Sequence, residues 1–142
     1  MSTETNKAIV RRCTEQLWNR HQTNLVEEFF DEKLNLHIAG MPSQTGLEHV
    51  SESVAMTKKA FPDFQIIIED EVAENEMVVI RWTMRATHQG EFFGIPATGK
   101  KITQSGITIN RLSNARISEL WYLADSMSLF QQIGAVPSPL SN

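Results

Sequence analysis

Asp125 is the carboxylate whose sequence surroundings most favour chemistry. It follows the apolar run 120–124 and precedes a short helix that we predict over 126–133. If the run is a strand, alternation places Asp125 on the same face as Trp121 and Leu123. An apolar setting raises the pKa of a carboxyl group toward the range of a general base. Aspartate is also a favoured helix N-cap, so the sequence is equally consistent with a capping role.

Three polar residues on predicted strands could bind a carbonyl group or move a proton. His88 ends a strand beside a glycine-rich loop, so it either lines a pocket mouth or, as we favour, bonds the loop backbone. His37 alternates with leucines, which places it on a pocket wall or in solvent. Gln104 lies within a long strand, where its amide could donate to a ligand or face solvent.

The tryptophans could wall a flat, apolar ligand. Trp18, Trp82 and Trp121 each bring a large apolar surface and one N–H donor. Core packing is the ordinary role of such residues. We therefore treat Trp18 and Trp121 as candidate substrate-binding residues whose alternative role is structural.

The loop 89–100 combines three glycines and a proline with apolar side chains. Phe92, Phe93 and Ile95 are too apolar for a solvated loop tip, so we expect at least two of them to fold inward. We predict that they cover a cavity mouth near His88 as a gate. The alternative is that they only plug one end of the sheet.

Several function classes conflict with the composition. Thirteen Lys and Arg against 17 Asp and Glu give a net charge of −4, which disfavours a nucleic-acid binder. The four histidines lack metal-ligand spacing, and the lone Cys13 excludes an internal disulfide, so we expect no metal and a reducing, cytoplasmic setting. No apolar run approaches 18 residues and the start lacks a signal-peptide pattern, so we expect no membrane contact.

The elements that must position these residues follow from hydrophobic periodicity. Ile9, Cys13 and Leu17 recur at helical spacing, whereas later segments alternate with a period of two. We predict helices over 7–21, 24–31, 46–60 and 126–133, and strands over 34–38, 64–73, 76–88, 101–112 and 115–124. The apolar residues of strand 101–112 change from even to odd positions around Gly106, which suggests a bulge there.

This order of elements indicates one α+β domain over 1–142, with a core of about 7–134 and a loose tail over 135–142. Helices should pack on one face of a meandering antiparallel sheet. Long, bulged strands curl, and a curled sheet that is closed by helices leaves a concave pocket for a small ligand.

Five short motifs carry a resemblance to a known family. They are Phe61-Pro62-Asp63, Thr87-His88-Gln89-Gly90-Glu91, Gly94-Ile95-Pro96-Ala97-Thr98-Gly99, Trp121-x-x-x-Asp125 and Gln132-Ile133-Gly134. With them, residues 8–136 resemble the SnoaL-like polyketide cyclase (ester cyclase) family of the nuclear transport factor 2-like superfamily. Ala97 and Ser113-Asn114-Ala115 depart from the family pattern, but only in loops.

The resemblance implies a cone-shaped, strongly bent antiparallel sheet, with N-terminal helices packed on its concave face around an apolar cavity. It implies an intramolecular aldol condensation without metal or organic cofactor, with Asp125 as general acid/base. His88, Gln104 or a tryptophan N–H would then steady the enolate oxygen. Candidate substrate-binding residues are Trp121, Gln104, Trp18, His37, Phe92 and Phe93.

The leading hypothesis is therefore a small-molecule enzyme acting on an apolar carbonyl compound. The main rival is a non-catalytic binder of an apolar small molecule. An isomerase or epoxide hydrolase is a weaker rival, because the only tyrosine, Tyr122, has the opposite parity to Asp125. Apolar residues at both parities of strands 76–88 and 101–112 also predict a homodimer formed through the sheet.

Overall fold

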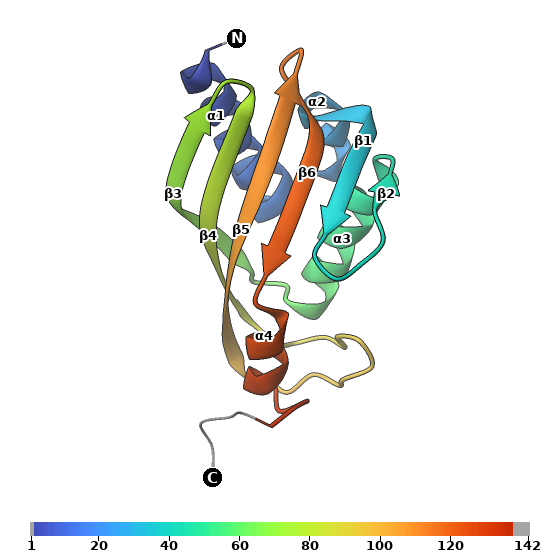
Figure 1. The fold of residues 1–142 in the computed structure, drawn as a ribbon. Coiled ribbons are helices and arrows are strands. Elements are labelled where there is room, and N and C mark those ends of the chain that lie inside the picture. The colour runs from blue at the N-terminus through green and yellow to red at the C-terminus, as the bar shows by residue number, and fades with distance from the viewer. Residues whose placement is uncertain (1, 138–142) are drawn as a thin grey trace.

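The computed structural model describes residues 2–137 of the 142-residue chain, so most of the predicted tail lies outside the described residues. The chain begins with helices, a further helix lies between the second and third strands in the sequence, another follows the last strand, and the strands form a single six-stranded sheet (Figure 1). Across residues 2–137, no helix is long and apolar enough to cross a membrane.

The first helix, α1, spans Thr3–Arg12, and the hydroxyl of Ser2 accepts a hydrogen bond from the Thr5 N–H at 3.1 Å. The helix continues with π-helical pitch over Cys13–Asn19. Together the two segments confirm the helix predicted over 7–21. The Asn19 side chain then bonds both the N–H and the carbonyl of Ile66, at 2.7 and 3.0 Å, and so fixes the helix end to the sheet.

The predicted helix over 24–31 is wrong in extent. A 3-10 turn over Thr23–Leu25 leads into α2, which spans only Val26–Phe29. The chain is already extended at Phe30, because Phe29 and Phe30 are both buried and bring it into the sheet. The next helix, α3, spans Glu48–Ala60, as predicted.

The strands form one sheet in the order β2-β1-β6-β5-β4-β3. Their bounds are β1 Phe30–Ile38, β2 Gln44–Thr45, β3 Gln65–Glu74, β4 Met77–Thr87, β5 Lys101–Ser113 and β6 Arg116–Ala124. Neighbours pair antiparallel except β1 and β6, which run parallel. The two-residue strand β2 and the parallel pair were not predicted, because β2 is too short to show alternation and the parallel pair depends on long-range register.

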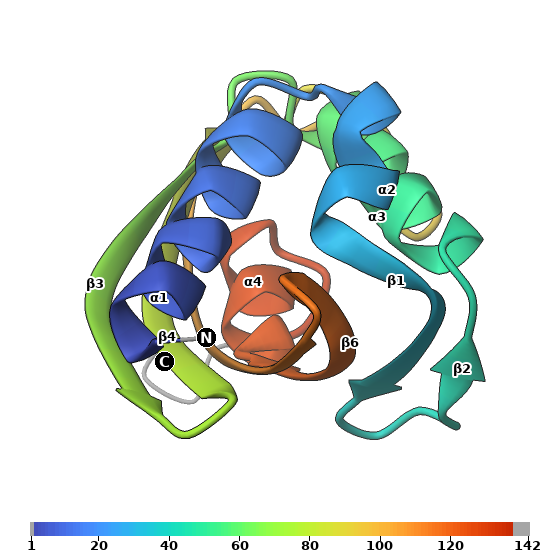
Figure 2. The same cartoon turned by 90° about the horizontal axis from the view of Figure 1, so that it is seen from above.

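The sheet curls around an interior that the helices close (Figure 2). The helices α1, α2 and α3 lie on its concave side, and α4, Ser126–Gln132, lies at one end of the strands (Figures 1 and 2). The predicted α+β fold with N-terminal helices on the concave face is confirmed.

Strand β5 has inverted polarity. Its even-numbered residues are buried and include the polar Gln104, Thr108 and Asn110, whereas the apolar Ile107 is 43% exposed on the outer face. The predicted bulge at Gly106 is wrong, since Gly106 pairs regularly with Trp82. In its middle, the strand therefore sends polar groups inward and Ile107 outward without a change of parity, while Ile102 and Leu112 face the core near its ends.

Candidate functional site

A cavity of about 490 Å³ lies between the concave face of the sheet and the helices. Its lining is mostly apolar and includes Val10, Cys13, Trp18, Leu36, Phe61, Ile80, Met84, Ile117 and Leu129. Met41, Met56 and Phe93 also line it and are 56%, 44% and 69% exposed, which marks the mouth. The volume lies in the range of about 300–1,000 Å³ that is typical of small-molecule pockets.

Four polar side chains enter this apolar space from two adjacent strands. Gln104, Thr108 and Asn110 come from β5, and Tyr122 comes from β6. The Asn110 amide donates to the carbonyl of Val78 at 3.3 Å, which fixes its orientation. Burial raises the pKa of Tyr122 to about 12, so its hydroxyl keeps its proton at neutral pH and can donate it in a hydrogen bond.

The Trp82 indole organises this polar group. Its ring stacks on Tyr122 with centroids 5.7 Å apart, and its N–H donates to the Thr108 hydroxyl at 2.9 Å. The Thr108 hydroxyl hydrogen is left free to donate elsewhere. The indole crosses β5 directly over Gly106, where any Cβ would collide with the ring. Glycine is therefore required at this position for close approach.

The helix α3 supplies the remaining polar part of the lining. His49, Glu52, Ser53 and Thr57 lie on its cavity side, near the mouth. His49 Nε2 is 3.7 Å from a carboxylate oxygen of Glu48. Glu52 is an exposed residue.

Four titratable side chains line the cavity: Cys13, His49, Glu52 and Tyr122. Burial raises the pKa of Cys13 and that of Tyr122 to about 12, so neither ionises near neutral pH. Among the lining residues, His49 carries the imidazole. Across residues 2–137, no group of three His, Cys, Asp or Glu side chains is placed to hold a metal ion.

The expectation that Asp125 lines the cavity beside Trp121 is wrong. Asp125 does share a face with Trp121 and Leu123, but that is the outer face, because Leu120 and Tyr122 take the inward positions of β6. The Asp125 side chain is exposed, and its carboxylate accepts the Ser128 N–H at 2.9 Å. The structure thus shows the capping role that the sequence left open.

His88 is fully buried but does not line the cavity. Its Nδ1 lies 2.9 Å from the Thr98 hydroxyl and accepts the Thr98 N–H at 3.3 Å. The ring therefore ties the two ends of the loop 89–100 together, which is the structural role that we favoured. Next to it, a Cβ on Gly90 would collide with the carbonyl oxygen of Lys59.

Asp63 belongs to the same set of loop contacts. Its carboxylate accepts the Thr87 N–H and hydroxyl, both at 2.7 Å. Burial acts to raise the pKa of Asp63, but these hydrogen bonds and the charge of Lys101 together lower it. Much of the motif pattern around Asp63, Thr87 and His88 is therefore structural.

Of the other predicted site residues, some line the cavity and some lie outside it. Gln104, Trp18, Phe92 and Phe93 line the cavity, as expected. Phe92 and Ile95 pack against the core, which confirms that two apolar residues of loop 89–100 fold inward.

His37 and Trp121 do not line the cavity. They stack on each other outside it, with centroids 5.3 Å apart. The expectation that they bind substrate in the interior is therefore wrong.

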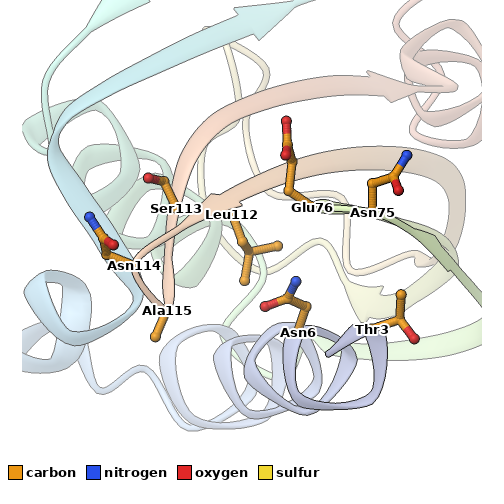
Figure 3. A pocket seen from close by; sticks show the side chains of 8 residues that line it. All are labelled: Thr3, Asn6, Asn75, Glu76, Leu112, Ser113, Asn114 and Ala115. Carbon is orange, nitrogen blue, oxygen red and sulfur yellow. The ribbon is translucent and has the colours of Figure 1, made fainter. Parts of the chain in front are cut away.

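A second hollow, of about 380 Å³, lies between the first turn of α1 and two hairpin turns (Figure 3). Its lining is mainly polar and comprises Thr3, Asn6, Asn75, Glu76, Leu112, Ser113, Asn114 and Ala115. The Asn6 side-chain oxygen is buried without a hydrogen-bond partner. It is closed off from solvent and offers no contact to a ligand in the hollow.

A family model for SnoaL-like polyketide cyclases matches residues 8–133. The chain belongs to the SnoaL-like polyketide cyclase family. No curated protein matches its sequence.

Solved SnoaL-like structures agree with this assignment. A proposed polyketide cyclase from Acidithiobacillus ferrooxidans is 28% identical, with a TM-score of 0.82 over 94% of this chain and 97% of that one. AclR from Streptomyces galilaeus, a proposed hydroxylase, is 25% identical, with a TM-score of 0.88 over 96% and 85%. A proposed SnoaL-like cyclase from Jannaschia sp. CCS1, 20% identical over 95% of both chains, shares the fold with a TM-score of 0.86.

Within this SnoaL-like cavity, the polar residues that sequence reasoning missed include Thr108, Asn110, Tyr122 and His49. The parity of β5 did carry a signal. Thr108 and Asn110 alternate with Ile107 and Ile109, and apolar residues on the outer face leave the polar ones facing inward. His49 lies on α3, and its place in the cavity lining depends on how that helix packs against the sheet, which local sequence spacing does not show.

Proposed function

We propose that this SnoaL-like protein binds an apolar carbonyl compound in the cavity and catalyses cofactor-independent acid/base chemistry next to the carbonyl. The observation that carries the proposal is the row of uncharged polar groups on an otherwise apolar wall. Gln104 and Tyr122 supply N–H and O–H donors without bringing a charge into the cavity. Such donors stabilise the negative charge that develops on an enolate oxygen.

The proposed base is His49. It is the imidazole of the lining, and neutral imidazole is a common general base near pH 7. In this scheme His49 takes a proton from the carbon beside the carbonyl, and the enolate oxygen accepts hydrogen bonds from Tyr122 and Gln104. In a cyclisation, the enolate carbon attacks a second carbonyl of the same molecule, and the new alkoxide takes the proton back from the imidazolium.

The similar structures described above are named for different reactions, a cyclase and a hydroxylase, so the fold does not choose the chemistry. The exposed position of Asp125 favours a second candidate, a binder without turnover. A binder needs the apolar cavity and its donors, but no base.

Deuterium exchange at the carbon next to the carbonyl of 1-indanone, followed by proton NMR in D2O, separates these functions. The enzyme proposal expects saturable binding and faster exchange than in buffer. His49→Gln should slow exchange at least tenfold with binding kept, since a general base contributes about 10²–10⁴-fold. Asp125→Asn is the matched control and should exchange within twofold of wild type.

Binding without accelerated exchange would support the binder. Exchange that is lost in Asp125→Asn but kept in His49→Gln would refute His49 as the base. Absence of saturable binding would refute both functions for ketones of this class.

We also propose that the protein forms a homodimer through the outer face of the sheet. Ile67, Ile107 and Leu123 are 41%, 43% and 58% exposed there, and Ile107 pairs directly with Leu123. Exposed apolar side chains on a sheet face favour association when a partner covers them. Sedimentation velocity at micromolar concentration should give a dimer for wild type and a monomer for Leu123→Lys. A wild-type monomer would contradict the proposal.

A further inference from the structure

Three side chains from two neighbouring strands and a loop form a hydrogen-bonded chain on the outer surface. His37 lies on β1, Glu119 lies on the neighbouring strand β6, and Ser43 lies in the loop before β2. The Ser43 hydroxyl is 2.7 Å from His37 Nδ1, and a Glu119 carboxylate oxygen is 2.7 Å from His37 Nε2. The strands β1 and β6 lie side by side in Figure 1.

The donor and acceptor roles in this chain follow from the chemistry of its groups. An ionised carboxylate only accepts hydrogen bonds, so His37 Nε2 carries a proton that it donates to Glu119. In the neutral ring, Nδ1 is then the acceptor, and the Ser43 hydroxyl donates to it. A hydroxyl bonded to an imidazole that a carboxylate orients is the arrangement that activates a serine as a nucleophile.

Neighbouring groups hold the imidazole and the carboxylate in place. The indole of Trp121 stacks on His37 at 5.3 Å, with the two planes 23° apart. Arg111 Nε lies 3.4 Å from Glu119, and its guanidinium carbon lies 5.7 Å from the Trp121 ring centre. The groups that set the charge around His37 are thus Glu119 from β6 and Arg111 from β5.

The chain is open to solvent and separate from the cavity. Ser43 is an exposed residue, and the His37 and Glu119 side chains are 29% and 27% exposed. The residues on either side of His37, Leu36 and Ile38, line the cavity instead, so the imidazole points away from it. A site this open to solvent gives little binding energy, which restricts the reaction to small, already activated substrates.

We propose that Ser43, His37 and Glu119 form a second, hydrolytic site that cleaves small activated esters. Ser43 Oγ attacks the ester carbonyl carbon, and its proton passes to His37 Nδ1. The carbon–oxygen bond to the leaving alcohol breaks, and the alcohol or phenol leaves with that proton. Water then gives a proton to His37 and attacks the acyl carbon; the bond to Ser43 Oγ breaks, Oγ takes that proton back from the imidazolium, and the carboxylic acid is released. Glu119 acts as a positioning residue that favours the imidazolium.

The first test is covalent labelling with a fluorophosphonate, located by peptide mass spectrometry. We expect an adduct on Ser43 with loss of fluoride, no adduct on the exposed outer-face Ser105, and none in Ser43→Ala. The Leu123→Lys variant is labelled alongside, so that dimerisation cannot hide Ser43. An adduct on another serine, or none in either protein, would overturn the proposal.

The second test is hydrolysis of p-nitrophenyl acetate across pH. Ser43→Ala should lower the protein-dependent rate at least tenfold, and Ser105→Ala should leave it unchanged. Glu119→Gln should lower kcat more than it changes KM, because the carboxylate positions the imidazole, and Glu119→Asp, which keeps the carboxylate, should restore part of the rate. Equal rates for Ser43→Ala and wild type would overturn the proposal, as would equal rates for Glu119→Gln and wild type.

Discussion

Gly106→Ala tests whether the Trp82 indole organises the cavity wall. The backbone at Gly106 suits alanine, because its φ lies outside the left-handed region, so the effect comes only from the added methyl group. That carbon would lie 2.6 Å from Trp82 Cε2 and 2.7 Å from Cη2, well inside van der Waals contact. The buried indole would have to move, and its stack on Tyr122 and its hydrogen bond to Thr108 would be disturbed.

The expected cost combines two effects. Overpacking a core costs about 1–3 kcal/mol, and the hydrogen bond to Thr108 is worth about 0.5–1.5 kcal/mol. Their sum is a loss of about 1.5–4.5 kcal/mol in the free energy of unfolding, or about 5–15 °C in Tm for a domain of this size. Urea unfolding followed by tryptophan fluorescence measures it.

A double-mutant cycle with Trp82→Leu identifies the cause. If the indole is the obstacle, Gly106→Ala should cost much less in the Trp82→Leu background, with a coupling of at least about 1 kcal/mol. Additive losses would refute the reasoning. So would a Gly106→Ala protein within about 0.5 kcal/mol of wild type with unchanged fluorescence.

Four further substitutions test the helix cap, the Asp63 contacts and the loop 89–100. Asp125→Ala should cost about 1 kcal/mol in urea unfolding through loss of the N-cap, with 1-indanone binding unchanged; weaker binding would contradict its placement outside the cavity. Thr87→Val should raise the pKa of Asp63 in a carbon-detected NMR titration. Because the folded pKa of Asp63 is lowered, its ionised form stabilises the protein at pH above the unfolded pKa. This contribution disappears as pH falls through the folded pKa. Thr87→Val should therefore destabilise the protein more at pH 7 than at low pH. Phe92→Ala should cost about 2 kcal/mol or more and weaken binding, whereas Phe93→Ala should cost less than about 0.5 kcal/mol, since Phe93 is 69% exposed; equal losses would contradict the inward packing of Phe92.

Periodicity was enough to predict most of the fold. Hydrophobic spacing gave α1, α3 and the long strands, because helix and strand periods are local properties of the chain. The start of β1 at Phe30 and its parallel pairing with β6 were missed. Both depend on contacts with residues more than 80 positions away, which local spacing does not contain.

The site was predicted only in part, for a geometric reason. Alternation shows which residues share a face of a strand, but not which face becomes concave. Asp125 and Trp121 share a face as expected, yet the curl of the sheet turns that face outward and places Tyr122 inside. Gln104 was a candidate because an amide on a long strand is unusual, and the structure places it in the cavity.

In the proposed function, Gln104 and Tyr122 bind the carbonyl oxygen of a ligand in the cavity. The carbon-13 shift of carbonyl-labelled 1-indanone bound to the protein tests it directly, because hydrogen bonds to the oxygen move this resonance downfield. We expect the carbonyl resonance of the bound ketone to lie downfield of its position in cyclohexane. This shift should be smaller in Tyr122→Phe and in Gln104→Leu. A bound resonance at the cyclohexane position, or one that neither substitution changes, would contradict it.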